Sequence, residues 1–315
     1  MTWQKQGLIY NHDGKLDWAQ HTVLTPQPFV LNDEVIRIYA GFRDNAGVSR
    51  IGYIDVDATN PSNVLGVSPT PVLDVGRDGM FDDNGLLLGD VVRHDDEIRM
   101  YYVGFQLPSK AKFMAFSGMA VSTDGGEHFQ RVQETSVMDR QLGANFIRAI
   151  HTVLRDDGVW KVWYSVGDDW ELINGVKYPQ YHIMYTESLD GVTFPDPVGT
   201  ACVLPTEEEY RIGRPRVFKT ASGYEMHATS DTYNKTYMAQ RLTSLDGKTW
   251  TRTGETVLPL GEERAWDGES VCYPVTVETA GKRYLFYSGN GMGRSGVGYA
   301  EWHEPNAGQE GQASS

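Results

Sequence analysis

The chain of 315 residues has little that indicates secretion, metal binding or membrane insertion. Its two cysteines, Cys202 and Cys272, lack metal-type spacing and are expected to be reduced thiols. No apolar run approaches the roughly 18 residues that a membrane span needs. The first residues contain no basic segment followed by an apolar one, so no signal peptide is expected. We therefore expect a cytoplasmic protein without a membrane span, and no spacing indicates a cofactor or a metal.

Positive charge is also scarce, with 28 Lys and Arg against 42 Asp and Glu, for a net charge of −14. Nucleic-acid binding needs a basic surface that neutralises phosphates, so no nucleic-acid partner is expected. Helical periodicity is nearly absent as well. Alternation with period two is common, as in residues 37–40 and 161–164, where β-branched and aromatic side chains face one side. These patterns predict an all-β protein.

A unit of strands returns about every 60 residues. Equivalent positions in the first strands are 61, 62, 64 and 59 residues apart, at Val30, Val91, Val153, Val217 and Thr276. A turn and an aromatic strand follow each one. Three units also contain Ser-x-Asp-Gly, at 122–125, 188–191 and 244–247, which suits a turn between a third and a fourth strand. Repeated units of four antiparallel strands predict a five-bladed β-propeller.

The repeat also predicts the domain organisation and the place of a site. The units follow one another without a linker, so we expect one propeller domain over residues 1–303 and a disordered polar tail over 304–315. The aromatic residues after the Ser-x-Asp-Gly turns, Phe129, Phe194 and Trp250, are expected to pack between neighbouring sheets. The segments that enter the first strands meet at one mouth of the central channel, where a pocket is expected.

Acidic residues fall at equivalent places before the first strands of blades two and five. The candidates for catalysis are Asp82, Asp83, Asp267 and Glu269. Carboxylates that face one another across a confined channel suit glycosyl transfer, in which one donates a proton to the leaving oxygen and another, ionised, activates a nucleophile or stabilises positive charge. The alternative is structural, with these acids capping turns or accepting backbone hydrogen bonds.

Arginine and histidine residues gather at the entries of blades three and four and in blade one. Guanidinium forks suit carboxylate or phosphate oxygens, so this group indicates a substrate with an anionic part. The candidates for substrate binding are His21, Arg43, Asp44, Arg148, His151, Arg211 and Tyr273. The alternative is that each arginine pairs with a neighbouring acid, and this role is favoured for Arg214 and Arg216. Tyr273, Trp266, Trp170 and Tyr181 are the aromatic residues expected to border the mouth.

The five-unit pattern, its Asp-Gly turns, second strands such as 100–104 and the acids at blade entries resemble the five-bladed β-propeller glycosidase superfamily. That superfamily includes arabinanase/xylosidase-like, invertase-like and mannoside-phosphorylase-like enzymes. Segments 81–85, 266–274 and 289–300 are similar to a branch whose relatives are often encoded among bacterial surface-polysaccharide genes. The resemblance implies a glycosidase-like enzyme that acts on a carbohydrate or glycoconjugate at the central channel.

The chain departs from the catalytic pattern of these relatives. Arabinanase-like enzymes carry a base Asp in blade one and an acid Glu in blade three, where this chain has His21 and Arg148 with His151. The invertase-like Asn-Asp-Pro-Asn motif is absent, although Arg43-Asp44 is similar to an invertase-like Arg-Asp pair. A hydrolase, a phosphorylase and a transferase therefore stay open as enzyme classes. A sugar-binding propeller without catalysis is the alternative outside enzymes.

Overall fold

The computed structural model describes residues 2–194 and 199–303, and its regular structure is almost entirely β-strand. The expected all-β class is confirmed, while the expected tail, 304–315, lies outside the described residues. Nothing helical in the described ranges has the length and hydropathy of a membrane span. The elements are β1 (Thr2–Tyr10), β2 (His21–Val30), β3 (Val35–Arg43), β4 (Ser49–Asp57), β5 (Val64–Val67), β6 (Leu86–His94), β7 (Glu97–Gln106), β8 (Met114–Ser122), β9 (Gln130–Arg131), β10 (Ile147–Asp156), β11 (Val159–Ile173), β12 (Val176–Ser188), β13 (Thr200–Val203), β14 (Glu209–Thr220), β15 (Gly223–Thr232), β16 (Tyr237–Ser244), β17 (Thr251–Thr256), β18 (Cys272–Thr279), β19 (Lys282–Ser288), α1 (Asn290–Gly293) and β20 (Val297–His303).

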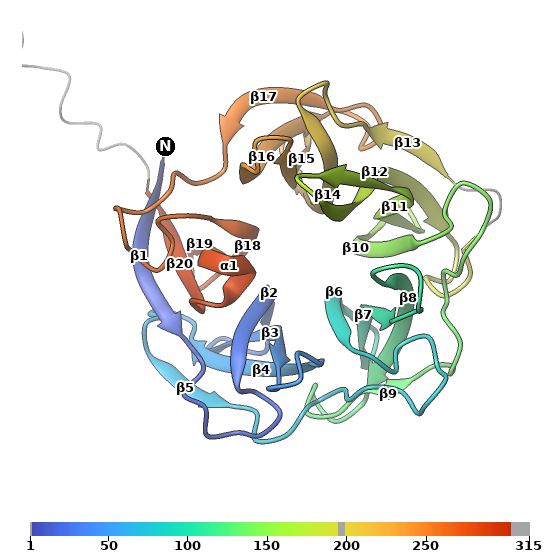
Figure 1. The fold of residues 1–315 in the computed structure, drawn as a ribbon. Coiled ribbons are helices and arrows are strands. Elements are labelled where there is room, and N and C mark those ends of the chain that lie inside the picture. The colour runs from blue at the N-terminus through green and yellow to red at the C-terminus, as the bar shows by residue number, and fades with distance from the viewer. Residues whose placement is uncertain (1, 195–198, 304–315) are drawn as a thin grey trace, which may run out of the picture.

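The strands form antiparallel sheets in which neighbours in sequence are neighbours in space (Figure 1). β2–β5 form one four-stranded sheet and β14–β17 form another. The N-terminal β1 pairs with β20 and completes a four-stranded sheet with β18 and β19. An eight-stranded sheet holds β6–β9 and β10–β13, and its two halves are joined by the parallel pairs Ile147–Ala115 and Arg148–Phe116. The predicted units of four antiparallel strands are thus present.

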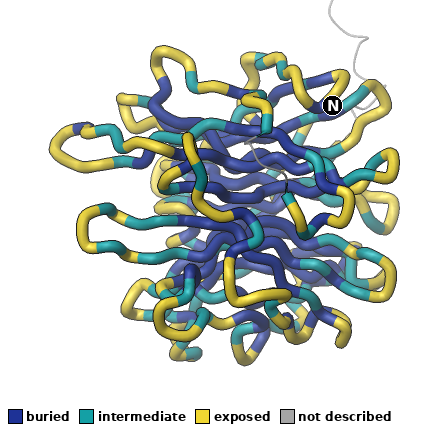
Figure 2. Tube along the Cα trace, turned by 90° about the vertical axis from the view of Figure 1, so that its right-hand side faces the viewer, coloured by how far each residue is buried: buried dark blue, intermediate teal, exposed yellow. Residues whose placement is uncertain are grey.

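The sheets stand in a ring with β2, β6, β10, β14 and β18 nearest its centre (Figure 1). Each of these strands contacts the next one around the ring, and β18 contacts β2. Buried residues follow the strands, and exposed residues concentrate in the loops at the outer ends (Figure 2). This arrangement brings the first strand of every unit to one central region.

Clusters of buried apolar side chains lie between neighbouring sheets. One joins Tyr39 of the β2–β5 sheet to Leu88 and Tyr102 of the β6–β9 half. Similar clusters lie between the other neighbours around the ring. Phe129, Phe194 and Trp250 belong to three of these clusters, which confirms their predicted packing role. Each sheet therefore buries both of its faces against its neighbours, as propeller-like stacking requires.

The Ser-x-Asp-Gly turns tie one sheet to the next. In the turn at 244–247, Ser244 Oγ accepts the N–H of Gly247 at 2.9 Å, and Gly247 has φ +75°. The carbonyl of Gly247 accepts a hydrogen bond from Trp163 Nε1 at 2.7 Å, across the boundary between sheets. Two further bonds repeat this link, from Tyr39 Oη to Gly126 O at 3.0 Å and from Tyr101 Oη to Gly191 O at 2.8 Å. The repeated motif thus fixes the spacing between sheets as well as the turn.

Each innermost strand carries a β-bulge at an equivalent place in the sheet. The bulged positions include Thr25, Gly89, His151, Arg214 and Tyr273. Thr25, Arg214 and Tyr273 have φ of +55°, +53° and +57°, and a proline follows each one. A bulge bends its strand and redirects a side chain, and a left-handed non-glycine backbone persists only where surrounding structure holds it. The bulges therefore change where side chains point at the centre of the ring.

Candidate functional site

A cavity of about 510 Å³ lies where the innermost strands and their entry loops meet, and we call it the central pocket. Its volume is in the range of small-molecule sites. Apolar side chains cover one part of its wall, including Leu24, Leu86, Leu87, Val103, Phe105, Phe113, Ala115, Ile147 and Ala149. Polar side chains cover the rest, including Arg43, Ser49, Asn84, Lys112, His151, Ser165, Tyr178, Tyr181, Arg211, Arg214, Tyr237 and Tyr273. All the sheets contribute to this wall.

The polar wall of the central pocket is cationic. It contains Arg43, Lys112, Arg211 and Arg214, and no aspartate or glutamate of residues 2–194 and 199–303 is among its lining residues. The buried Nε atoms of Arg43, Arg211 and Arg214 have no hydrogen-bond partner within the described part of the chain. Buried donors are normally satisfied, so several unsatisfied ones around one cavity favour an acceptor-rich ligand.

Arg211 is held from one side by an acid and enclosed by tyrosine rings. Its Nη2 donates to Asp231 Oδ2 at 2.6 Å. Its guanidinium carbon lies 5.0 to 5.9 Å from the ring centres of four tyrosines, which are Tyr178, Tyr181, Tyr210 and Tyr237. Rings at this distance stabilise a cation through their quadrupoles. The guanidinium is thereby fixed in place while its Nε remains uncommitted.

A second group of polar side chains comes from three of the bulges and from β16. Arg214 Nη1 lies 3.0 Å from His151 Nδ1, and the Arg214 guanidinium lies 5.1 Å from the ring centre of Tyr273. The Tyr237 hydroxyl donates to the Tyr273 hydroxyl at 3.1 Å. Burial raises the pKa of Tyr273 to about 12 and raises that of Tyr237 well above its usual value. Both phenols therefore keep their protons at neutral pH.

An extended hairpin brings aromatic side chains to the pocket wall. β11 and β12 have 15 and 13 residues and turn at Asn174 and Gly175, with φ of +49° and +78°. Asn-Gly with both residues at positive φ is typical of a tight hairpin turn that matches the strand twist. The hairpin positions Tyr178 and Tyr181 in the lining. The Asn-Gly signal is present in the sequence at 174–175, but Tyr178, Lys112, Ser165 and Tyr237 were not among the predicted site residues.

Four of the predicted substrate-binding residues are brought together in the central pocket. They are Arg43, His151, Arg211 and Tyr273, and Arg214, for which a structural pairing was favoured, joins them. The other three are not among the lining residues. His21 Nδ1 lies 2.8 Å from Thr22 Oγ1, Asp44 forms an ion pair with Arg50 at 2.7 Å, and Arg148 Nη1 donates to Asp139 O at 3.0 Å.

Two of the predicted catalytic acids form matching ion pairs away from the pocket lining. Asp82, whose side chain is 0% exposed, accepts hydrogen bonds from Arg131 Nε at 2.8 Å and from Tyr102 Oη at 3.1 Å. Asp267 accepts from Lys5 Nζ at 2.6 Å and from Tyr287 Oη at 2.8 Å. Arg131 and Lys5 lie on the outermost strands, β9 and β1, of the sheets that the two acids precede. Each acid thus ties an entry loop to the outer edge of its sheet.

The surroundings of these two acids repeat as well. Phe81 stacks on Tyr102 and Trp266 stacks on Tyr287, both with an interplanar angle of 27°. The other two candidate acids make fewer contacts. Asp83 Oδ2 accepts the N–H of Gly79 at 2.8 Å, and Glu269 is exposed. None of the four is among the lining residues of the central pocket, and Asp83 alone shows the predicted alternative of accepting a backbone hydrogen bond.

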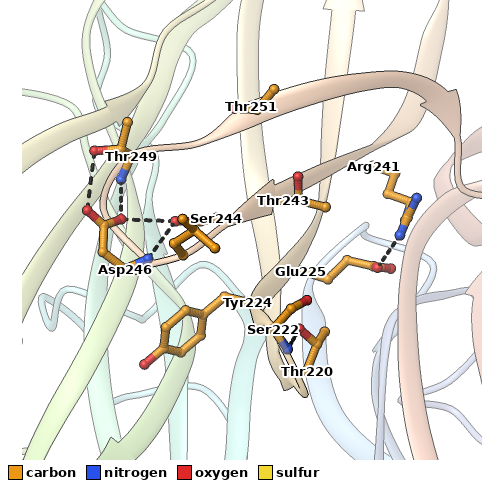
Figure 3. A pocket seen from close by; sticks show the side chains of 11 residues that line it. Thr220, Ser222, Tyr224, Glu225, Arg241, Thr243, Ser244, Asp246, Thr249 and Thr251 are labelled. Carbon is orange, nitrogen blue, oxygen red and sulfur yellow. Dashed lines mark hydrogen bonds and ion pairs between the residues drawn. The ribbon is translucent and has the colours of Figure 1, made fainter.

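A second hollow, of about 560 Å³, lies on the β14–β17 sheet (Figure 3). Its charged groups are engaged with neighbours inside the hollow or beside it. Arg241 pairs with Glu225 at 2.8 Å, and Asp246 Oδ1 accepts the N–H of Thr249 at 2.8 Å (Figure 3). None of the buried unpartnered side-chain atoms belongs to its lining. The central pocket is therefore the stronger candidate site.

The acids and histidines give no sign of a metal centre. Across residues 2–194 and 199–303, no group of three or more His, Cys, Asp or Glu side chains is placed to hold a metal ion. The two cysteines are unpaired, and burial raises the pKa of each thiol to about 12. Thiols with so high a pKa are poor nucleophiles at neutral pH.

No family model matches the chain. It is 30% identical over 300 residues to the uncharacterized protein Rv1502 of Mycobacterium tuberculosis (strain ATCC 25618 / H37Rv), an alignment that covers 95% of this chain and 99% of that protein. The uncharacterized protein MT1551 of strain CDC 1551 / Oshkosh matches with the same identity and coverage. These alignments extend over nearly the whole chain.

Several solved structures with a similar fold are described as glycoside hydrolases. A thermostable family-43 glycoside hydrolase superposes with a TM-score of 0.69 at 13% identity, over 94% of both chains. A glycosyl hydrolase from Bacteroides ovatus superposes with a TM-score of 0.67 at 15% identity, over 96% of this chain and 90% of that one. At such low identity the likeness establishes only that the fold is shared.

Proposed function

This chain belongs to the same family as Rv1502 of Mycobacterium tuberculosis, and from its fold and its central pocket we propose that it is a carbohydrate-active enzyme. The reaction is cleavage or transfer of a glycosyl unit in the central pocket. The substrate is a carbohydrate or glycoconjugate that carries an anionic group. In this proposal the five blades are β2–β5, β6–β9, β10–β13, β14–β17, and β18–β20 completed by β1.

The observation that carries the proposal is that buried arginine N–H groups without hydrogen-bond partners and tyrosine rings line the same cavity. Arg43 and Arg211 offer buried Nε–H groups, which suit a carboxylate or phosphate oxygen. Tyr178, Tyr181 and Tyr273 offer flat faces with a hydroxyl at the edge, which suit the apolar face and the hydroxyls of a sugar ring. The absence of lining carboxylates leaves an anionic substrate without like-charge repulsion.

Proton transfer in this pocket falls to phenols because no carboxylate lines it. Tyr273, with its pKa raised to about 12 by burial, stays protonated at neutral pH and can give its proton to the leaving oxygen. The Tyr237 hydroxyl donates to Tyr273 and stabilises the phenolate that forms. The acceptor of the glycosyl unit is water in a hydrolase, phosphate in a phosphorylase or a hydroxyl in a transferase, the three enzyme classes left open by the sequence. As the new bond to the sugar forms, the O–H proton of the acceptor passes to the Tyr273 phenolate and restores the phenol.

The test is turnover of acidic glycans and nucleotide-sugars, with and without inorganic phosphate, followed by mass spectrometry of the products. Replacing Tyr273 with phenylalanine is expected to lower the rate by about a hundredfold or more, since general acid catalysis contributes roughly 10²–10⁴. Tyr185→Phe is the matched control, because Tyr185 bonds Glu187 away from the pocket. Turnover that survives Tyr273→Phe would refute the assignment of the proton donor.

A second candidate function is glycan binding without catalysis. The observation in its favour is that no Asp or Glu is among the residues lining the central pocket, whereas most glycoside hydrolases use a pair of carboxylates. Calorimetry that detects binding of an acidic glycan, together with no product after long incubation, would favour this candidate over the enzyme.

A further inference from the structure

Arg214 is the most deeply buried cation of the central pocket wall that lacks an acidic partner. Arg214 is 7% exposed, and its Nη1 donates to Leu88 O and to His151 Nδ1, each at 3.0 Å. Its Nε and Nη2 atoms are buried and bond to none of the described residues. Among the ion pairs found in residues 2–194 and 199–303, none involves Arg214, while the neighbouring Arg216 lies 3.7 Å from Asp90.

The two unused nitrogens of Arg214 form one edge of the guanidinium. Nε and Nη2 point two parallel N–H groups to the same side, which suits two oxygens of one oxyanion. The protein uses this edge elsewhere for carboxylates. Arg37 holds Asp55 through Nε and Nη2 at 2.8 Å each, and Arg77 holds Glu134 through the same atoms at 3.0 and 2.8 Å. The Nε–Nη2 edge of Arg214 bonds to no carboxylate of the described residues.

The contact with Arg214 also sets the protonation state of His151. A guanidinium can only donate, so Nδ1 of His151 must accept and carries no proton. Burial, with the charges of Arg214 and Arg216, holds the pKa of His151 well below its usual value. The imidazole is therefore neutral with its proton on Nε2, the nitrogen that Arg214 does not occupy. His151 and Arg214 both line the central pocket, and the neutral imidazole leaves the positive charge of Arg214 uncompensated.

The backbone conformation and the burial of Arg214 both lower the stability of the protein when no ligand is bound. Arg214 has φ +53° in a bulge, and burial lowers its pKa. A buried cation without a partner and a strained non-glycine residue both reduce stability, and such features concentrate at binding sites. Tyr273, beneath the guanidinium at 5.1 Å, offsets part of this cost through its ring.

We propose that the Nε–Nη2 edge of Arg214 binds two oxygens of a carboxylate or phosphate group on the ligand of the central pocket. The oxyanion lies at the bottom of the pocket, and the rest of the ligand extends toward Tyr178, Tyr181 and Lys112. That the rest is a sugar rests on the proposed function, whereas the oxyanion rests on Arg214 alone.

The test is calorimetric titration of the full chain with D-glucuronate, glucose 6-phosphate and inorganic phosphate, with methyl glucoside as the neutral comparison. Wild type is expected to bind at least one anion and to bind methyl glucoside more weakly. Arg214→Lys keeps the charge but loses the paired donors, so anion binding is expected to weaken about tenfold to hundredfold, the loss of a charged hydrogen bond. Binding of glucuronate alone assigns a carboxylate, and binding of the phosphates alone assigns a phosphate.

Thermal unfolding without ligand provides the second measurement. Arg37→Met is the matched control, because Arg37 is similarly buried, at 3% exposed, but forms ion pairs with Asp55 and Glu127. Arg37→Met is expected to lower the melting temperature, and Arg214→Met is expected to leave it unchanged or raise it. The inference is overturned if no anion binds to wild type, or if Arg214→Lys binds anions as wild type does. Turnover of a neutral glycan with intact anion binding would overturn only the anionic substrate of the proposed function.

Discussion

Replacing Asp82 with asparagine should destabilise the protein without weakening anion binding in the central pocket. Asp82 is fully buried and is paired with Arg131, whose side chain is 21% exposed. Removing one member of a buried ion pair costs roughly 3–5 kcal/mol, and we expect about 2–3 kcal/mol because Arg131 can rehydrate in part. Asparagine retains an oxygen for the Tyr102 hydroxyl, so the loss reports mainly on the charge.

Urea unfolding followed by tryptophan fluorescence measures this change, and calorimetry with the anions above measures the pocket. Asp83→Asn is the matched control, because Asp83 has one backbone donor, Gly79 N–H, for which asparagine retains an oxygen, so the change should cost about 1 kcal/mol or less. A double-mutant cycle with Arg131→Met isolates the pairwise energy. An Asp82→Asn variant as stable as wild type but without turnover of an identified glycan would refute the structural role and restore the predicted catalytic one.

Three further predictions concern the ties within and between sheets. Asp267→Asn should cost about 2–3 kcal/mol for the same reason as Asp82→Asn, and Lys5→Met should lose a similar amount, measured by urea unfolding. If only one of the two variants is destabilised, the pair is not the source. Tyr101→Phe removes the bond to Gly191 O and should cost about 1 kcal/mol, whereas an unchanged unfolding midpoint would show that the link is not needed. Backbone N–H groups of Thr249 and Lys248 hold the pKa of Asp246 at about 2, below its unfolded value, so its stabilisation is complete at neutral pH and lost as the pH falls from about 4 to 2. Asp246→Asn should therefore cost about 1 kcal/mol at pH 7, discounted for exposure, and flatten the acid limb of a stability-against-pH curve; an unaltered acid limb would contradict the role of Asp246.

The fold was predictable because the contacts that repeat in space also repeat in sequence. The hydroxyl of Tyr101 and the indole of Trp163 both reach the glycine carbonyl of the next Ser-x-Asp-Gly turn, so the period of about 60 residues records the distance from one sheet to the next. Phe129, four residues after the glycine of the turn at 122–125, likewise packs between neighbouring sheets. A sequence period can report such contacts without any knowledge of side-chain direction.

The site was less predictable because it does not repeat. The repeat correctly predicted that Asp82 and Asp267 occupy equivalent positions. Their equivalence reflects two similar ion pairs at the outer edges of two sheets, Asp82 with Arg131 and Asp267 with Lys5. Arg214 was assigned a structural pairing because nothing in the sequence shows the bulge that turns it away from an acid. Tyr237 begins a third strand and reaches the pocket only through the packing of β16 against β18.

The bulges explain how a repeating frame supports one asymmetric pocket. Five strands share the bulge, and its residues are threonine, glycine, histidine, arginine and tyrosine, at Thr25, Gly89, His151, Arg214 and Tyr273. Positions that pack between sheets must keep similar side chains, because each sheet meets a similar neighbour. A bulged residue leaves that pattern, so its side chain is free to differ from sheet to sheet. Gly89 shows the consequence most directly, since a Cβ there would lie 2.5 Å from Ile150 O, and the carbonyl of the preceding Leu88 accepts Arg214. The β6–β9 sheet thus has no side chain at its bulge, where the β14–β17 sheet has the cation Arg214. This difference between the sheets determines the ligand chemistry of the pocket.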